Sequence, residues 1–487
     1  MAYNLIPCDR DQQFLLPPNL HEWLPEDHLA RFAVEVVEQL DLKAFYGRHR
    51  EDGWGRAAYD PKMMVGLLLY SYAIGVRSSR EIEKRCREDV AYRFIAANEF
   101  PDHATIARFR AGHDELLAGL FIQALRLCAQ AGLVRVGLVA IDSKRVKANA
   151  ALSANKTRKS IEEEVKRILE EAAETDAAED RAHGQSRGDE LPEQLRDPRQ
   201  RLARLKEAKK RLDGEEAKRR QAYAQKLADR KAKEEKTGKR SRGRKPAPPE
   251  DVDKVPVNIT DQDSKIMKTH TGFIQGYNGQ ILVTEDQIVI SCDLTNEATD
   301  VGHLHPMIDQ ANANLQAVGM DAKIGVLLAD AGYYSEDNVI RQGEIPELLI
   351  ATKKDWKQKK AATQQRPRGR IPKNITTMQR MDRKLRTMRG AKLYRMRGQT
   401  VEPIFGQHDV RGFGRLHRRN LAPSRCEWIF ENTAHNLLKL WRSGKMCPTS
   451  STLHTRFSSQ PRYRPRLILR RGFRHLRPGL QDSVLSF

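Results

Sequence analysis

An abrupt change of composition near residue 150 constrains the architecture of this chain more than any other feature. The run from Val134 to Asp142 is apolar and rich in Val, as expected for a buried β-strand. Residues 151–250, in contrast, hold 28 basic and 21 acidic residues, with Tyr223 as the only aromatic. Such a segment cannot bury enough apolar surface to form its own core. We therefore expect a folded domain that starts with a strand and is interrupted by a charged helical insertion and linker over 151–255.

The segment before this strand, residues 1–133, is predicted to be all helical. Asp60-Pro61 has the pattern of an N-cap followed by a first-turn proline, and Ser78 with Glu81 has the spacing of a capping box. Short basic helices up to Arg110 fit either a helix-turn-helix or an ordinary helical bundle with a basic surface. The residues alone leave these two alternatives open.

Strand signals resume after residue 256. A helix is expected from Thr299 or Asp300 to Ala317, and mainly helix from about 353 to 442. This order describes an α/β mixed sheet covered by helices, built from residues 134–150 and 256–442. The predicted strands, with turn signals at Asn278-Gly279 and Glu285-Asp286, are residues 264–270, 279–284, 287–293, 323–330 and 347–352. Residues 443–487 lack periodicity, and we expect a basic, disordered tail.

The charge of the chain points to a polyanionic partner. Lys and Arg exceed Asp and Glu by 86 to 64, which gives a formal net charge of +22. We expect no membrane span and no signal peptide, because long uninterrupted apolar runs are absent from the sequence. The six cysteines are scattered without a C-x-x-C pair, which indicates neither a zinc site nor a disulfide framework but reduced thiols in a cytoplasm.

Two apolar strands are predicted to end in an acid, Asp142 and Asp330. Ligands gather at the carboxyl ends of strands in open sheets, so these acids can converge although they are far apart in the chain. Converging carboxylates in a basic protein suggest a divalent metal such as Mg²⁺. Taken singly, however, each Asp is more simply explained as the cap of the next helix.

Three ordered motifs resemble the DDE transposases of bacterial insertion sequences. The motifs are Ile141-Asp142-Ser143-Lys144, Leu328-Ala329-Asp330-Ala331-Gly332-Tyr333, and the segment from Tyr394 to Gly406 that contains Glu402. The resemblance runs from about residue 5 to Trp441 and includes the helical N-terminal domain, which it implies is DNA-binding. It further implies a ribonuclease-H-like core in which Asp142, Asp330 and Glu402 are catalytic and hold two Mg²⁺ ions, with Mn²⁺ as a possible substitute.

The same resemblance assigns DNA contacts. Tyr394 and Arg397, which precede Glu402 in the family signature, would position a phosphate, and Lys144 follows the first acid. The signature places a Lys seven positions after the Glu, where this chain has Asp409. Because a carboxylate beside a phosphate is unfavourable, we expect Arg411 or Arg415 to take over that contact.

The implied function is DNA transposition. The chain would bind the terminal inverted repeats of its element, hydrolyse a phosphodiester there and join the freed 3′-hydroxyl to target DNA. We expect a homodimer in the complex with double-stranded DNA, acting in the bacterial cytoplasm on the nucleoid. Two alternatives stay open: a nuclease of the same fold without strand transfer, and a catalytically impaired DNA-binding repressor, which Asp409 favours.

Overall fold

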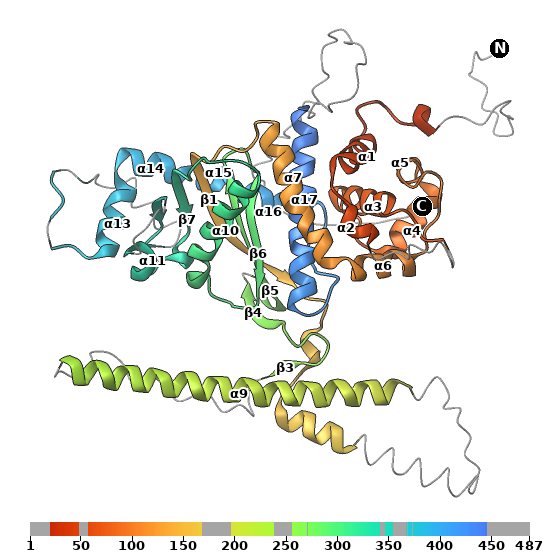
Figure 1. The fold of residues 1–487 in the computed structure, drawn as a ribbon. Helices are drawn as coiled ribbons and strands as arrows, with labels where there is room; N and C mark the ends of the chain where they lie inside the picture. Colours follow the sequence, from red (N-terminus) through yellow and green to blue (C-terminus); the bar gives the residue numbers. More distant parts are fainter. Residues whose placement is uncertain are drawn as a thin grey trace, which may run out of the picture. The chain divides into compact units, whose positions relative to one another are not determined.

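The computed structural model describes the helical region, the sheet with its helices and part of the insertion (Figure 1). Residues 168–195 and 238–255 of the predicted insertion and linker, and residues 446–487 of the predicted tail, lie outside the described residues. No described helix is both long and apolar enough to cross a bilayer. The described residues are 20–47, 57–167, 196–237, 256–269, 271–340, 346–353, 367, 369–372 and 374–445.

The N-terminal region is helical, as the sequence predicts. Asp60 caps α3 by accepting a hydrogen bond from a backbone N–H, and Pro61 lies in its first turn. The capping box predicted at Ser78 does not form, because Glu81 instead accepts a hydrogen bond from Arg85, one turn later. The elements are η1 (Leu20–Trp23), α1 (Leu29–Gln39), α2 (Lys43–Tyr46), α3 (Pro61–Ile74), α4 (Ser79–Glu88), α5 (Val90–Ile95), α6 (His103–Gly112) and α7 (Asp114–Gln130).

A six-stranded mixed sheet follows, with β4, β5, β1, β7 and β8 side by side and β6 paired with β5. β5 is antiparallel to its partners β1, β4 and β6, whereas β1, β7 and β8 are parallel. This is the ribonuclease-H-like arrangement that the resemblance implies. The strands are β1 (Leu138–Lys147), β4 (Lys265–Thr269), β5 (Gly272–Thr284), β6 (Val289–Thr295), β7 (Val326–Ala329) and β8 (Glu347–Ile350).

Two strand predictions are wrong for reasons that depend on partners distant in the sequence. β1 does not end at Asp142 but continues to Lys147, because β5 pairs with it as far as Gly276. The predicted turn at Asn278-Gly279 instead lies inside β5. Glycine is required at 279, since a Cβ there would lie 2.8 Å from the indole ring of Trp428.

Helices α10 (Leu304–Ala317) and α17 (Leu421–Ser443) cover opposite faces of β5 and β6. Trp428 of α17 lies against Gly279, whereas Ser291, on the other face, donates a hydrogen bond to Gln310 of α10 at 2.6 Å. A 3-10 turn, η5 (Val301–His303), precedes α10, so the helix starts later than predicted. The remaining elements are η6 (Ala331–Tyr333), α11 (Glu336–Ile340), α13 (Thr377–Arg386), α14 (Met388–Arg395), α15 (Arg397–Thr400) and α16 (Glu402–Val410).

The charged insertion contains the predicted long helix, α9 (Arg196–Thr237), which contacts the short strand β3 (Val257–Asn258) (Figure 1). β3 pairs with β2 (Asn155–Lys156). A small separate cluster of buried apolar side chains joins these parts: Ile161, Leu205, Ala208, Leu212 and Val257. The minor core thus combines apolar side chains of the insertion with Val257, which lies in the chain that follows the insertion.

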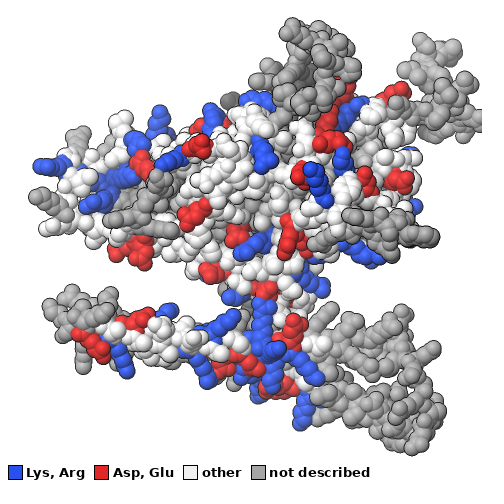
Figure 2. Space-filling view, in the orientation of Figure 1, with Lys and Arg blue, Asp and Glu red and all other residues white. Residues whose placement is uncertain are grey.

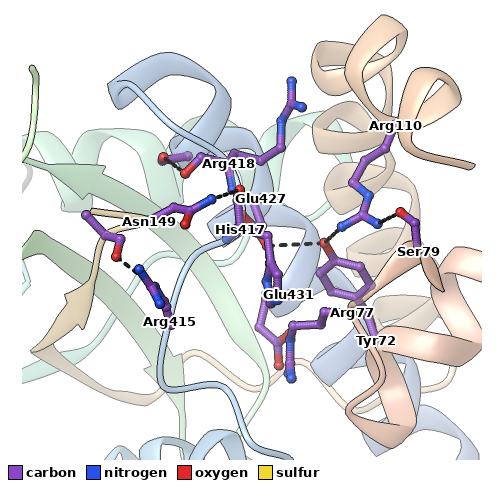
Figure 3. Close-up of polar contacts among 12 residues, drawn as sticks. Tyr72, Arg77, Ser79, Arg110, Asn149, Arg415, His417, Arg418, Glu427 and Glu431 are labelled. Carbon is purple, nitrogen blue, oxygen red and sulfur yellow. Dashed lines mark hydrogen bonds and ion pairs between the residues drawn. The ribbon is translucent and has the colours of Figure 1, made fainter. Parts of the chain in front are cut away.

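A buried charge network connects the N-terminal helices to α17 (Figure 3). Arg77, between α3 and α4, pairs with Glu431 at 2.8 Å, and the two side chains are 3% and 0% exposed. Arg411, at the end of α16, contacts the other carboxylate oxygen at 3.0 Å. Nearby, the Tyr72 hydroxyl donates to Glu427 at 3.4 Å. The helical region is therefore attached to α17 and to the end of α16 by charged groups that water does not reach.

We predict that Arg77→Ala lowers the free energy of unfolding by about 3–5 kcal/mol, because it leaves the buried Glu431 carboxylate with less compensation. Urea unfolding followed by circular dichroism measures this change. Arg85→Ala is the matched control, since Arg85 makes a partly exposed pair with Glu81 and its loss should cost about 0.5 kcal/mol or less. Equal effects of the two substitutions would contradict the structural role of the buried pair.

Candidate active site

The parallel pairing of β1 with β7 brings two of the predicted acids together. Ala140 of β1 pairs with Leu328 of β7, and the same register continued by two residues aligns Asp142 with Asp330. Asp330 directly follows β7, where one of its carboxylate oxygens accepts the N–H of Gly332 at 3.0 Å. The two carboxylates therefore lie at neighbouring positions on adjacent strands.

The third predicted acid, Glu402, begins α16, with Pro403 in the first turn. Arg397 of α15 lies between this acid and the first one. Its Nη2 is 2.8 Å from Oδ2 of Asp142, and its Nη1 is 3.6 Å from Oε1 of Glu402. The Asp142 side chain is 15% exposed and that of Glu402 is 56% exposed. The guanidinium thus links a shielded carboxylate to one that faces solvent.

Electrostatics makes Asp142 the unusual member of this group. Burial raises the pKa of its carboxyl to about 7, Arg397 opposes this rise, and the neighbouring Asp330 carboxylate adds to it. Within the described part of the chain, no three Asp, Glu, His or Cys side chains are already arranged to hold a metal ion. The donor chemistry nonetheless fits a hard divalent cation, because all three groups offer oxygen and crowding of two carboxylates disfavours their ionisation.

Lys144 lies two residues after Asp142 and therefore on the same face of β1. Its ammonium forms an ion pair with Asp409 of α16 and lies 3.5 Å from the carbonyl oxygen of Phe405. Asp409 is thus in contact with one of the predicted phosphate ligands.

The other predicted DNA contacts lie in different environments. Arg411 is paired with Glu431 in the buried network and its side chain is 9% exposed, which contradicts the expectation that it contacts a phosphate. Arg415 is exposed and donates to the carbonyl of Ala148, just beyond β1. Tyr394 of α14 is buried against the main core. Of the two arginines proposed to replace the missing Lys, only Arg415 is accessible.

Asp300 is a further acid near the site that the sequence predicted only as a helix cap. It accepts hydrogen bonds from Asn278 at 2.7 Å and Gln280 at 2.8 Å, and it pairs with Arg145 at 3.4 Å. These donors hold its pKa below the usual value although burial opposes the shift. The polar residues Asn278 and Gln280, which alternate along β5 and therefore share one face, were the signal that could have revealed it.

His408, in the last turn of α16, is fully buried among aromatic rings. Neither of its ring nitrogens has a hydrogen-bond partner among the described residues. Burial and the nearby His435 lower its pKa well below the usual value, with Arg411, Lys144 and Arg77 contributing to the same shift. His435 is also buried, and burial lowers its pKa to about 3. Both imidazoles therefore remain neutral inside the fold.

We predict that stability falls as the pH drops below about 6.5, because these imidazoles gain protons in the unfolded chain but not in the folded one. Each contributes up to about 1.4 kcal/mol per pH unit until its folded pKa is reached. His408→Leu should stabilise the protein by about 1 kcal/mol or more at pH 7.5, since unsatisfied polar atoms are removed. The advantage should widen at pH 5.5 in urea unfolding.

A non-titrating neighbour serves as the control for this series, and Phe413→Leu, in the same aromatic shell, should leave the slope of stability against pH unchanged. A His408→Leu variant that is less stable than the parent at both pH values would show that the imidazole is satisfied in solution.

Family comparisons agree with the motifs. Residues 18–112 match the family described as a transposase domain (DUF772), and residues 244–437 match the transposase DDE domain. Together the matches cover more than half of the chain; the second includes Asp330 and Glu402, whereas Asp142 lies outside both. Comparisons with curated proteins and with solved structures gave no match. The strand order, the motifs and the two family matches lead to one conclusion, that the chain belongs to the DDE transposases of the insertion-sequence type.

Proposed function

We propose that this transposase cleaves DNA at the ends of its insertion sequence and joins the resulting 3′-hydroxyl to target DNA. The proposal is supported by the way Arg397 contacts both Asp142 and Glu402 while Asp142 lies beside Asp330. Asp142 lies in β1, Asp330 directly follows the adjacent parallel strand β7, and Glu402 begins α16.

Asp142, Asp330 and Glu402 would hold two Mg²⁺ ions, or Mn²⁺ in their place, and such ions supply Lewis-acid stabilisation of the phosphodiester oxygens when bound. Groups of the protein itself orient the acids and set their ionisation. The backbone N–H of Ser143 donates to Asp142 at 2.9 Å and fixes the orientation of its carboxylate. Full ionisation of that carboxylate requires compensation of the charge that Asp330 brings.

Arg397, Lys144 and Arg415 would bind the DNA backbone beside these acids. Tyr394, which is buried against the core, would act only by fixing the segment that leads to Arg397. Arg397 offers paired guanidinium donors of the type that fit a phosphate. Its side chain is 7% exposed and held by Asp142 and Glu402, so a phosphate would reach it only in exchange for one of these carboxylate contacts. Arg415 would extend the cationic surface beyond the end of β1.

The described surface offers further basic groups for double-stranded DNA. Lys and Arg side chains gather over α13 and α14, interspersed with a few acids, on the face seen in Figure 2. Helices α4 and α6 expose Arg80, Lys84, Arg87 and Arg108. We propose that the N-terminal helices bind the terminal inverted repeats, and that a homodimer processes both ends in the bacterial cytoplasm.

We predict that Asp142→Asn, Asp330→Asn and Glu402→Gln each lower DNA cleavage by roughly three orders of magnitude or more, since several kcal/mol of transition-state stabilisation is lost. Binding to a duplex that carries the element's ends should change little. Gel-based cleavage and fluorescence anisotropy measure the two properties. The exposed Asp321 is the control, and Asp321→Asn should behave like the parent. An Asp330→Asn variant that still cuts would remove the site assignment.

We predict that nicking of an end-containing duplex requires Mg²⁺ or Mn²⁺ and stops in excess EDTA, because the acids alone cannot neutralise the charge that develops on the phosphodiester. A target plasmid added to the same reaction separates the alternatives. Joined products indicate transposition, cuts alone indicate a nuclease, and binding without nicking indicates a repressor. Full activity in EDTA would contradict the proposed metal site.

A further inference from the structure

We propose that Asp409 acts as an intramolecular competitor of DNA, occupying Lys144 at the site where a backbone phosphate must bind. This inference rests on the proposed function, since it assumes that DNA enters beside Asp142, Asp330 and Glu402. Asp409 would lower the affinity for DNA by pairing with Lys144, which is then less available to a phosphate.

Helix geometry places Asp409 on the DNA-facing side of α16. Asp409 follows Glu402 by seven residues, which is close to two full turns, so both side chains project from the same face of the helix about 10 Å apart. β1 places Lys144 on the same face as Asp142. The helix and the strand therefore face each other with one ion pair between them, Lys144 to Asp409.

The exposures of the two side chains show which one meets an incoming phosphate first. Asp409 is 62% exposed, whereas Lys144 is 17% exposed and also directed toward the Phe405 carbonyl at 3.5 Å. A phosphate approaching Lys144 from solvent consequently meets a carboxylate of like charge. It must displace that carboxylate to reach the ammonium group.

The charged groups around the Lys144–Asp409 pair determine how strongly this pair affects DNA binding. Asp142, Asp330 and Glu402 all bring negative charge to the region that receives the phosphate, and the Arg397 guanidinium is already shared between two of them. Lys144 lies on the same face of β1 as Asp142, and its ion pair is with Asp409 rather than with one of the three acids. When Lys144 is paired with Asp409 it no longer offsets the charge of the three acids, which weakens association with a polyanion.

The competition can be measured as binding of an end-containing duplex by fluorescence anisotropy in EDTA, where no cleavage occurs. Asp409→Asn should bind about 3- to 10-fold more tightly than the parent, since an exposed ion pair no longer opposes the phosphate. Its affinity should also fall more steeply with salt, by up to about one unit in the slope of log K against log salt. Asp409→Glu keeps the charge and should bind like the parent.

A double-mutant cycle with Lys144→Gln tests whether Lys144 is the intermediary. The gain from Asp409→Asn should disappear when residue 144 is uncharged. An equal gain in both backgrounds would overturn the inference, as would an unchanged affinity in the single variant. Failure of the parent and of Asp409→Asn alike to bind at low salt would instead refute the proposed function.

Discussion

Glu431 is the side chain on which the arrangement of this protein most depends. Its carboxylate is fully buried, and a buried charge requires compensation. Arg77 supplies it from the N-terminal helices, and Arg411 supplies it from the end of α16. The same contact region is tight, since a Cβ on Gly75 would lie 2.3 Å from the carbonyl oxygen of Arg411. Glu402 lies on α16. The N-terminal helices contact the end of this helix, so they help to hold the proposed active site in place.

Charge balance is the second constraint, and the adjacent acids Asp142 and Asp330, proposed to be catalytic, violate it locally. Asp142 is shielded from water and lies beside Asp330, so its carboxyl is harder to ionise than one in solvent. Arg397 offsets part of this charge, and Asp300 is offset separately by Arg145 and two amides. The charge of Asp300 is therefore compensated by groups of the protein. The charge of the adjacent pair Asp142 and Asp330 is compensated only in part, as expected for a site that binds a cation.

Local patterns in the sequence predicted local structure well. The cap at Asp60, the strand before Asp330 and the start of α16 at Glu402 all depend on neighbours in the chain. The predictions were wrong where a residue distant in the sequence determines the local structure. β1 passes Asp142 because β5 pairs with it, Gly279 lies in a strand because Trp428 covers it, and Arg411 is internal because Glu431 requires a partner. The association of Arg397 with two acids likewise depends on the packing of α15, which no periodicity reveals.

Helix α16 carries two consecutive unusual residues that act on separate properties. His408 lacks hydrogen-bond partners among the described residues inside a shell that includes Phe413 and Trp428, so its cost falls on folding stability. Asp409 faces solvent and pairs with Lys144, so in our proposal it lowers the affinity for DNA. Neither residue displaces the catalytic acids. A repressor would need strong binding with catalysis lost, whereas Asp409 weakens binding and leaves the acids in place. The substitution at this position therefore fits a transposase of reduced DNA affinity better than a binding protein without chemistry.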